Sequence, residues 1–113
     1  TEALTRLFVK LHDIGTADNL RVITISSVYG TYPGINHAFT ASKAAQIMLM
    51  KSYANLYSHI TFNCVSPCEV ADAGSPKNVN LKAKDVANLV VFLCSDKGKY
   101  INAQNIVVGE HVG

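Results

Sequence analysis

The sequence is poor in charge, and the charge it carries is scattered. Only 16% of the 113 residues are charged, and the formal net charge is +2. Proteins that bind nucleic acid usually gather Lys and Arg on one face or in one run. Because no such run occurs here, the sequence predicts no nucleic-acid partner.

Long apolar runs and paired cysteines are also lacking. No run of about eighteen apolar residues, the length that a membrane-spanning helix needs, is present, so we expect no membrane span. The chain has three cysteines, an odd number, at positions Cys64, Cys68 and Cys94. They lack the spacing of zinc ligands, which predicts free, buried thiols and no metal site. Free thiols also predict a reducing, cytoplasmic location. Thr1 stands where an initiator Met would be, which is compatible with a start inside a longer polypeptide.

The length allows one small domain, and the apolar pattern predicts alternating helices and strands. A chain of 113 residues buries roughly two-thirds of the surface that it exposes when unfolded. Helical spacing of apolar residues predicts a helix over residues 2–14 that ends at Gly15. The elements predicted after it are a strand at 21–25, a helix at 37–57, a strand at 59–66, a helix at 84–94 and a strand at 105–108. This order predicts a parallel sheet with right-handed crossovers.

The helix predicted over residues 37–57 is apolar around most of its circumference, since Lys43 and Lys51 are its only charged residues. A helix of this kind must be buried on nearly every side. One side can cover the sheet of its own chain, so the other side predicts a second layer, most simply from a partner subunit. Four further side chains are expected to serve packing rather than ligand binding: Met48, Met50, Tyr53 and Tyr57.

The residues that could carry chemistry follow the first strand. That strand ends near Ser27, a turn rich in Gly and Pro follows, and the next helix places Phe39 four residues before Lys43. This pattern resembles the short-chain dehydrogenase/reductase family, in which a Ser is followed about a dozen residues later by Tyr-x-x-x-Lys. Residues 63–68 (NCVSPC) resemble the family's Asn-x-x-x-Pro-Gly, and residues 100–104 (YINAQ) resemble Tyr-Ile-Thr-Gly-Gln. The resemblance covers essentially the whole chain.

The resemblance implies a Rossmann-like, three-layer α/β/α fold with a parallel sheet. The three predicted strands would be the last three of the family's doubly wound sheet, so residues 1–113 would form a single partial domain, the C-terminal half of the fold. The strand at 21–25 would then leave an apolar edge open where the N-terminal half docks. Family members commonly pack the helices that correspond to residues 2–14 and 37–57 against their copies, which implies homologous subunits as partners.

In the family, the lysine ammonium lies beside the tyrosine hydroxyl and lowers its pKa, so that the phenol can exchange a proton with the substrate while a nicotinamide exchanges hydride. Phe39 lacks that oxygen, and losing a general acid or base costs about 100- to 10,000-fold in rate. We therefore expect Ser27, Phe39 and Lys43 to be inactive remnants of the motif. Lys43 is the single candidate for a cofactor contact.

Further residues either lie near enough in sequence to replace the missing hydroxyl or differ from the family pattern. Tyr29, Tyr32 and His37 lie near the motif and could supply a proton, although side chains at such positions are ordinarily surface residues. Cys68 stands where the family has Gly, and Asp72 stands where it usually has a Thr near the cofactor, so its carboxylate would disfavour a pyrophosphate. The seven glycines form no phosphate-binding turn, and the stretch from 67 to 81 is shorter than the family's substrate-covering segment.

Three functions stay open on this sequence. The leading hypothesis is a catalytically degenerate subunit with a scaffolding or assembly role, paired with an active subunit that binds NAD(P). Heteromeric family members of this kind exist, such as the hydroxyacyl-CoA dehydrogenase of anaerobic toluene breakdown. The alternative is an NAD(P)-dependent oxidoreductase of alcohols or ketones, hydroxyacyl-CoA included, that an N-terminal half completes. The third is a pseudoenzyme that binds a small molecule for regulation.

Overall fold

The computed structural model describes residues 20–30, 36–75 and 77–110. The elements within them are β1 (Arg21–Ile25), the short 3-10 helix η1 (Val28–Gly30), α2 (His37–Leu56), β2 (Thr61–Pro67), α3 (Ala83–Cys94), the 3-10 helix η2 (Asp96–Gly98) and β3 (Asn105–Val108). The helix predicted over residues 2–14 and its cap at Gly15 lie outside the described residues. The order of the remaining elements agrees with the sequence prediction.

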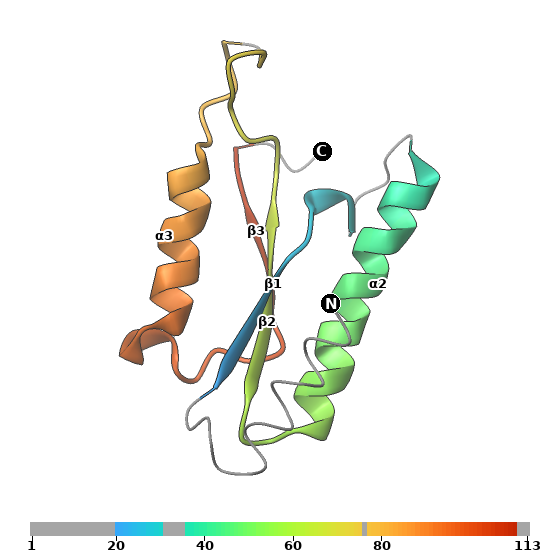
Figure 1. Cartoon of the computed structure of the whole chain (residues 1–113), viewed down its shortest axis with the longest axis vertical. Coiled ribbons are helices and arrows are strands. Elements are labelled where there is room, and N and C mark those ends of the chain that lie inside the picture. Colours follow the sequence, from blue (N-terminus) through green and yellow to red (C-terminus); the bar gives the residue numbers. More distant parts are fainter. Residues whose placement is uncertain (1–19, 31–35, 76, 111–113) are drawn as a thin grey trace.

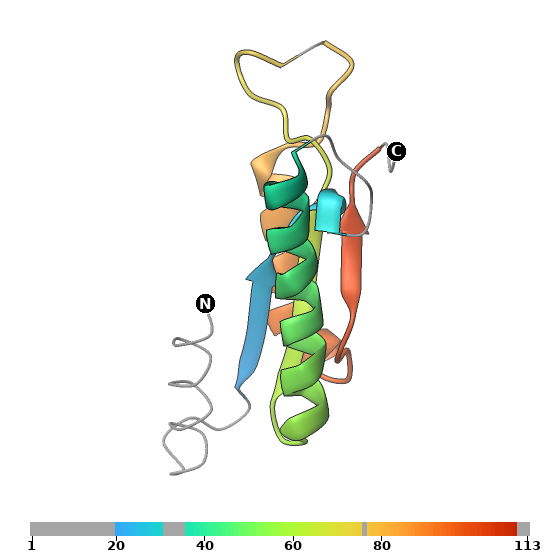
Figure 2. The same ribbon diagram turned by 90° about the vertical axis from the view of Figure 1, so that its right-hand side faces the viewer.

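The three strands form one parallel sheet in the order β1-β2-β3. The register places Ile23 opposite Asn63 and Val65 opposite Ile106, so β2 is the central strand. Helix α2 covers one face of the sheet and α3 covers the other (Figure 1), as the view turned by 90° also shows (Figure 2). Parallel neighbours need crossovers of this kind because the chain must return to the same end of the sheet. The predicted Rossmann-like, three-layer α/β/α fold is confirmed.

Strands β1 and β3 have the predicted bounds, whereas β2 begins and ends later than expected. Pro67 was expected to stop the strand, but it is the last residue of β2 and lies opposite Val108. Proline is tolerated there because the next residue continues the ladder. The N–H group of Cys68 donates a hydrogen bond of 2.8 Å to the carbonyl oxygen of Val108. Residues 59–60 belong to the turn that precedes the strand.

The core lies between α2 and the sheet. Its buried residues are Ile47, Met50, Tyr53, Ala54, Ile60, Phe62 and Cys64. The ring of Tyr53 stacks on Phe62 with 5.8 Å between centroids and on Tyr57 with 5.9 Å. The packing roles predicted for Met50, Tyr53 and Tyr57 are thus confirmed. Met48 is 62% exposed on the side of α2 that faces away from the sheet, so its packing role, which depends on a second layer, stays a prediction.

Helix α3 is tied to the sheet at its C-terminal end. The guanidinium group of Arg21 on β1 donates to the carbonyl oxygen of Leu93 at 2.9 Å and to that of Ser95. These carbonyl groups lie at the end of the helix, where no further turn can supply N–H donors. At the other end, the carboxylate of Asp85 accepts a hydrogen bond of 2.9 Å from the backbone N–H of Lys82. Both ends of α3 therefore have hydrogen-bond partners.

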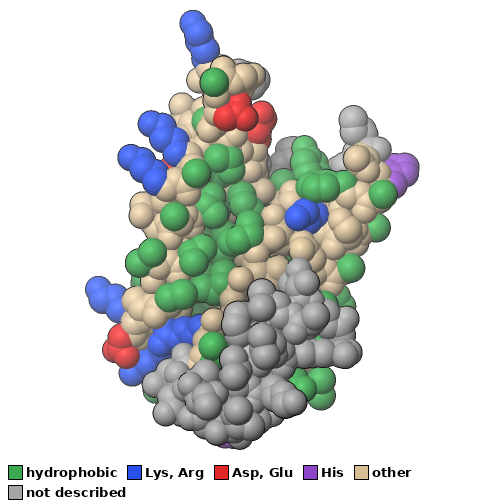
Figure 3. Space-filling view, in the orientation of Figure 1, with side chains coloured by type: hydrophobic (Ala, Val, Ile, Leu, Met, Phe, Trp, Pro, Cys, Tyr) green, Lys and Arg blue, Asp and Glu red, His purple; other side chains and the backbone are tan. Residues whose placement is uncertain are grey.

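An apolar strip runs between α3 and the strands on the side of the molecule shown in Figure 3, with basic side chains around its margin. Val86, Leu89 and Val90 of α3 are half-buried, and Ile25 of β1 is 46% exposed. Within the described residues, β1 pairs with β2 and with no other strand. The open edge that the sequence predicted at residues 21–25 is therefore present in this part of the chain. No helix among the described residues is long and apolar enough to span a membrane.

Candidate functional site

Two consecutive serines follow β1 and have different surroundings. Ser26 is buried, its N–H group donates to the carbonyl oxygen of Val65 at 2.8 Å, and its Oγ donates to the carbonyl oxygen of Lys43 at 3.0 Å. Ser27 is half-buried, and its Oγ accepts a hydrogen bond of 3.2 Å from the N–H group of Tyr29. Ser26 thus holds the end of β1 against α2, while Ser27 is the serine with the more accessible hydroxyl.

The start of α2 brings Phe39 and Lys43 together, as their four-residue spacing predicts. Asn36 caps the helix by accepting a hydrogen bond of 3.0 Å from the N–H group of Phe39. The Nζ atom of Lys43 lies 5.4 Å from the centroid of the Phe39 ring, a distance at which a cation is attracted to an aromatic face. The ring is 42% exposed. The site therefore keeps the arrangement of the ring and the ammonium group but has no hydroxyl on the ring.

Gly30 lets η1 pack closely on α2. A Cβ atom on this residue would lie 2.6 Å from Cδ1 of Ile47 and 3.0 Å from the carbonyl oxygen of Lys43. Any larger residue would push the turn away from the helix, so close approach requires glycine here. Ser26 and Gly30 therefore both fix the turn that carries Ser27 against the helix segment that carries Lys43. The sequence did not predict these roles of Ser26 and Gly30. Their signals in the sequence are the pair of serines at 26–27 and the glycine at position 30.

The positions near the family's cofactor site lie where β2 ends. Cys68 follows the strand and is half-buried, and it leaves no room for a side chain at Gly109, where a Cβ atom would lie 2.6 Å from its Sγ. Asp72 lies exposed in the following loop, where its Oδ1 accepts hydrogen bonds from the Gly74 N–H group at 2.8 Å and the Ser75 hydroxyl at 3.1 Å. These bonds form a local turn, so the carboxylate organises its own loop. Its effect on a cofactor stays a prediction.

The candidate substitute acids Tyr29 and His37 are not linked to the motif. Tyr29 is 45% exposed, and His37 is exposed at the first position of α2. Within the described residues, no hydrogen bond joins either side chain to Ser27 or Lys43. Tyr32 lies outside the described residues. The geometry therefore offers no assembled replacement for the missing hydroxyl in this part of the chain.

The three cysteines are free, but only one of them is buried as predicted. Cys64 is buried, and burial raises its pKa from the ordinary 9.0 to about 11, with a smaller opposing effect from the charge of Lys51. Cys68 is half-buried and Cys94 is exposed at the end of α3, so the prediction of buried thiols was wrong for Cys94. Helix α3 is apolar on several sides, and the pattern did not reveal which side faces water. No group of three His, Cys, Asp or Glu side chains suited to a metal occurs among the described residues.

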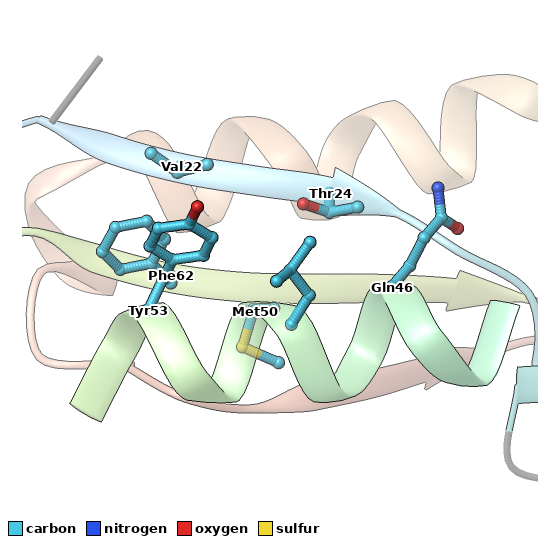
Figure 4. A pocket seen from close by; sticks show the side chains of 7 residues that line it. Val22, Thr24, Gln46, Met50, Tyr53 and Phe62 are labelled. Carbon is cyan, nitrogen blue, oxygen red and sulfur yellow. The ribbon is translucent and has the colours of Figure 1, made fainter. Parts of the chain in front are cut away.

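The hollow shown in Figure 4 is separate from the motif. It lies between α2 and the sheet. The volume that the centre of a water molecule can occupy is ≈ 10 Å³, so the hollow has room for about one water. Its lining residues are Val22, Thr24, Gln46, Leu49, Met50, Tyr53 and Phe62. The Oε1 atom of Gln46 is buried there without a hydrogen-bond partner. None of the predicted site residues lines the hollow, so it adds nothing to the candidate chemistry.

Two of the matched motifs have structural roles. The side chain of Asn63, which is buried, donates to the carbonyl oxygen of Ile101 at 2.9 Å and accepts a hydrogen bond of 3.1 Å from the N–H group of Gln104. Between these two residues Ala103 has φ of +59°, a left-handed conformation that favours glycine. The family pattern has Gly at this position. The motifs at residues 63–68 and 100–104 therefore hold each other in place at the amino end of the sheet.

Comparison with known proteins finds a matching family model and similar sequences. The family model described as "short chain dehydrogenase" matches residues 3–84. A curated relative, (+)-borneol dehydrogenase 2 of Salvia officinalis, is 36% identical over a stretch that covers 77% of this chain and 41% of the relative. That alignment is 116 residues long although the chain has 113 residues in total, so the relative carries additional residues within the matched stretch.

Solved structures agree with this result. A putative oxidoreductase from Escherichia coli is 33% identical, with a TM-score of 0.71 over 79% of this chain and 40% of its own. A 4-hydroxyisoleucine dehydrogenase is 22% identical, which supports the fold alone, with a TM-score of 0.82 over 95% of this chain and 51% of its own. The chain thus spans about half or less of the length of these relatives.

Proposed function

Because this chain belongs to the short-chain dehydrogenase family, we propose that it is a catalytically degenerate member that acts by assembly with an active, homologous oxidoreductase subunit. The observation that carries this proposal is the contact between Phe39 and Lys43, with 5.4 Å from the Nζ atom to the ring centroid. A phenylalanine ring can neither donate nor accept the proton that a hydroxyl or carbonyl substrate exchanges during hydride transfer. Lys43 keeps its charge beside a group that cannot titrate.

The segment between β2 and α3 supports a non-catalytic role. It is shorter than the substrate-covering segment that the resemblance implies, so it would shield a reacting substrate poorly from water. In this proposal the NAD(P) that the resemblance implies is bound by the partner subunit, and the free thiols fit a reducing location such as the cytoplasm.

A second function has its own support. Ser26 and Gly30 hold Ser27 and Lys43 in a defined arrangement, which a chain that has only a scaffolding role would not require. Since the chain matches 40% of the E. coli structure, an N-terminal half could complete a nicotinamide site. The protein would then be an NAD(P)-dependent oxidoreductase of alcohols or ketones in which another residue replaces the missing hydroxyl.

A turnover assay separates the two proposals. The chain, with any native extension, is incubated with NAD⁺ or NADP⁺ and a panel of secondary alcohols, and the absorbance of the reduced nicotinamide is followed. The degenerate-subunit proposal expects no turnover above buffer, and turnover at the rate of an ordinary family member would overturn it. The matched variant Phe39→Tyr restores only the oxygen, so activity in that variant alone would show that this atom is what the site lacks.

Lys43 provides the control for that result. Activity gained through Phe39→Tyr should disappear when Lys43→Met is added, because the phenol then loses the neighbouring positive charge. If both variants stay silent, the loss extends to the cofactor site, which again supports a non-catalytic chain.

A further inference from the structure

The hollow between α2 and the sheet contains a polar atom that lacks a partner. Oε1 of Gln46 is buried, and no group among the described residues donates a hydrogen bond to it. A buried acceptor that gives up its bond to water and gains no other destabilises the fold. Native structures leave few such atoms unsatisfied, so a buried water is the expected source of the missing donor.

The hollow has the size and the second polar group that a bound water needs. It has room for about one water molecule, and Thr24 lines it together with Gln46. Figure 4 shows Gln46 reaching from α2 toward β1, with Thr24 on the β1 side of the same space. A threonine hydroxyl both donates and accepts, whereas the Gln46 oxygen only accepts. One water can therefore donate to Gln46 and keep a second hydrogen bond to Thr24.

The two residues lie next to a direct contact between β1 and α2. Side chains of a strand alternate between the faces of the sheet, so Thr24 lies on the same face as Ser26. The Oγ atom of Ser26 donates to the carbonyl oxygen of Lys43 at 3.0 Å. Gln46 follows Lys43 by three residues and thus lies about one turn further along the helix. A bridge from Thr24 to Gln46 would therefore join the strand to the helix at a second, neighbouring point.

We propose that one water molecule occupies this hollow and bridges the hydroxyl of Thr24 to Oε1 of Gln46. Most of the remaining lining is apolar, including Leu49, Met50 and Phe62, which leaves the water few alternative partners. The bridge is a positioning contact, because it holds the strand that precedes the two serines against the helix that carries the motif lysine. It does so whether or not the chain turns over a substrate, so the inference is independent of the proposed function.

A double-mutant cycle on the full chain tests the bridge. Gln46→Met and Thr24→Val each keep the approximate shape of the side chain and remove its polar atoms. Each alone should lower the urea concentration at the midpoint of unfolding, because the water loses a partner. The double variant should lose about as much as the more damaging single variant, since both remove the same bridge. Additive losses would overturn the proposal. A higher midpoint in Gln46→Met would overturn it too, because a dry hollow gains when the unsatisfied oxygen is removed.

Thr61→Val is the matched control for Thr24→Val. Thr61 also has a buried hydroxyl oxygen without a partner in the described part of the chain, but it does not line the hollow. The effects of Thr61→Val and Gln46→Met should therefore add. Coupling as strong as that between Thr24→Val and Gln46→Met would show that the cycle reports a general change of packing, which would overturn the proposal.

NMR observes the water itself. In the parent protein, the methyl groups of Leu49 and Met50 should show NOEs to water with the sign that belongs to a long-lived bound molecule. The exposed methyl group of Met48 should not show them, because surface water exchanges rapidly. Gln46→Met should abolish the NOEs in the hollow. Their absence from the parent protein, or their persistence in Gln46→Met, would contradict the bridge.

Discussion

The two ends of the sheet differ in what their side chains do. At the amino end Ile60 and Phe62 are each 1% exposed, and Phe62 stacks on Tyr53. At the carboxyl end Ser27 is half-buried and Phe39 is 42% exposed. The amino end holds the fold together, and the carboxyl end carries the groups with which the family does its chemistry. Residues at the carboxyl end can therefore change without loss of the fold, which explains how the chain keeps its architecture beside a motif that lacks its hydroxyl.

Replacing a phenylalanine by alanine should affect the free energy of unfolding very differently at the two ends of the sheet. This is the largest difference that we expect. Phe62→Ala removes a fully buried ring and should lower the free energy of unfolding by about 3–5 kcal/mol. Phe39→Ala removes an exposed ring together with one cation–π contact and should cost about 1 kcal/mol or less. Urea unfolding followed by circular dichroism measures both. Equal losses for the two variants would mean that the carboxyl end belongs to the core, and the contrast between the ends would be wrong.

The two serines should show the next largest difference. Ser26→Ala removes a buried hydrogen bond to the carbonyl oxygen of Lys43 and should cost about 0.5–1.5 kcal/mol. Ser27→Ala should cost about 0.5 kcal/mol or less, because its hydroxyl is more accessible and makes one local bond. Thermal unfolding of both variants checks the order. A larger loss for Ser27→Ala would contradict the structural role given to Ser26.

A substitution at the amino end should increase stability. Ala103 has a left-handed backbone conformation, which costs about 1–2 kcal/mol for a residue with a side chain. Ala103→Gly removes that cost and loses about 0.5–1 kcal/mol through the greater freedom of the unfolded chain. The net gain should be about 0.5–1 kcal/mol. The control, Ala87→Gly within α3, should instead lose about 1 kcal/mol in the same urea experiment, and a loss at both positions would show that Ala103 is not strained.

The middle of β2 gives a test by pH. The folded state raises the pKa of Cys64 to about 11 through burial, against 9.0 ordinarily. Below pH 9 the thiol is protonated in both states, but between pH 9 and 11 the unfolded chain releases this proton more readily. The free energy of unfolding should therefore fall with rising pH in that range, and less so in Cys64→Ala. The control is Cys94→Ala, which removes an exposed thiol and leaves the buried Cys64 in place, so the decrease that Cys64 causes should remain. Equal slopes for all three proteins would contradict the burial of Cys64.

The sequence predicts the fold well because β1 and β3 are runs of β-branched and apolar residues with clear ends. It predicts less about α2 and α3, since a helix that is apolar on nearly every side does not reveal which side faces the sheet. For this reason the exposure of Cys94 was missed. Pro67 was placed outside β2 because the pattern does not show that the last residue of this central strand can pair without donating a hydrogen bond.

The candidate site was predictable where it depends on local spacing. The distance of four residues on one helix is enough to place Phe39 beside Lys43. The roles of Ser26 and Asn63 depend instead on how β1 packs on α2 and how β2 meets residues 101–104, which are contacts between distant parts of the chain. No sequence pattern encodes these contacts directly.

The smallest change to the molecule tests the central claim, that α2 keeps the ring and the ammonium group of the motif side by side and lacks only the hydroxyl of that pair. Phe39→Tyr should alter stability by less than about 0.5 kcal/mol, and the introduced phenol should titrate below its ordinary pKa of about 10, because the ammonium group of Lys43 lies beside the ring. NMR of ring-labelled tyrosine follows the additional resonance against the parent protein. The account predicts a lowered pKa that returns to about 10 when Lys43→Met is added. The same pKa with and without Lys43 would show that the two residues no longer form a site.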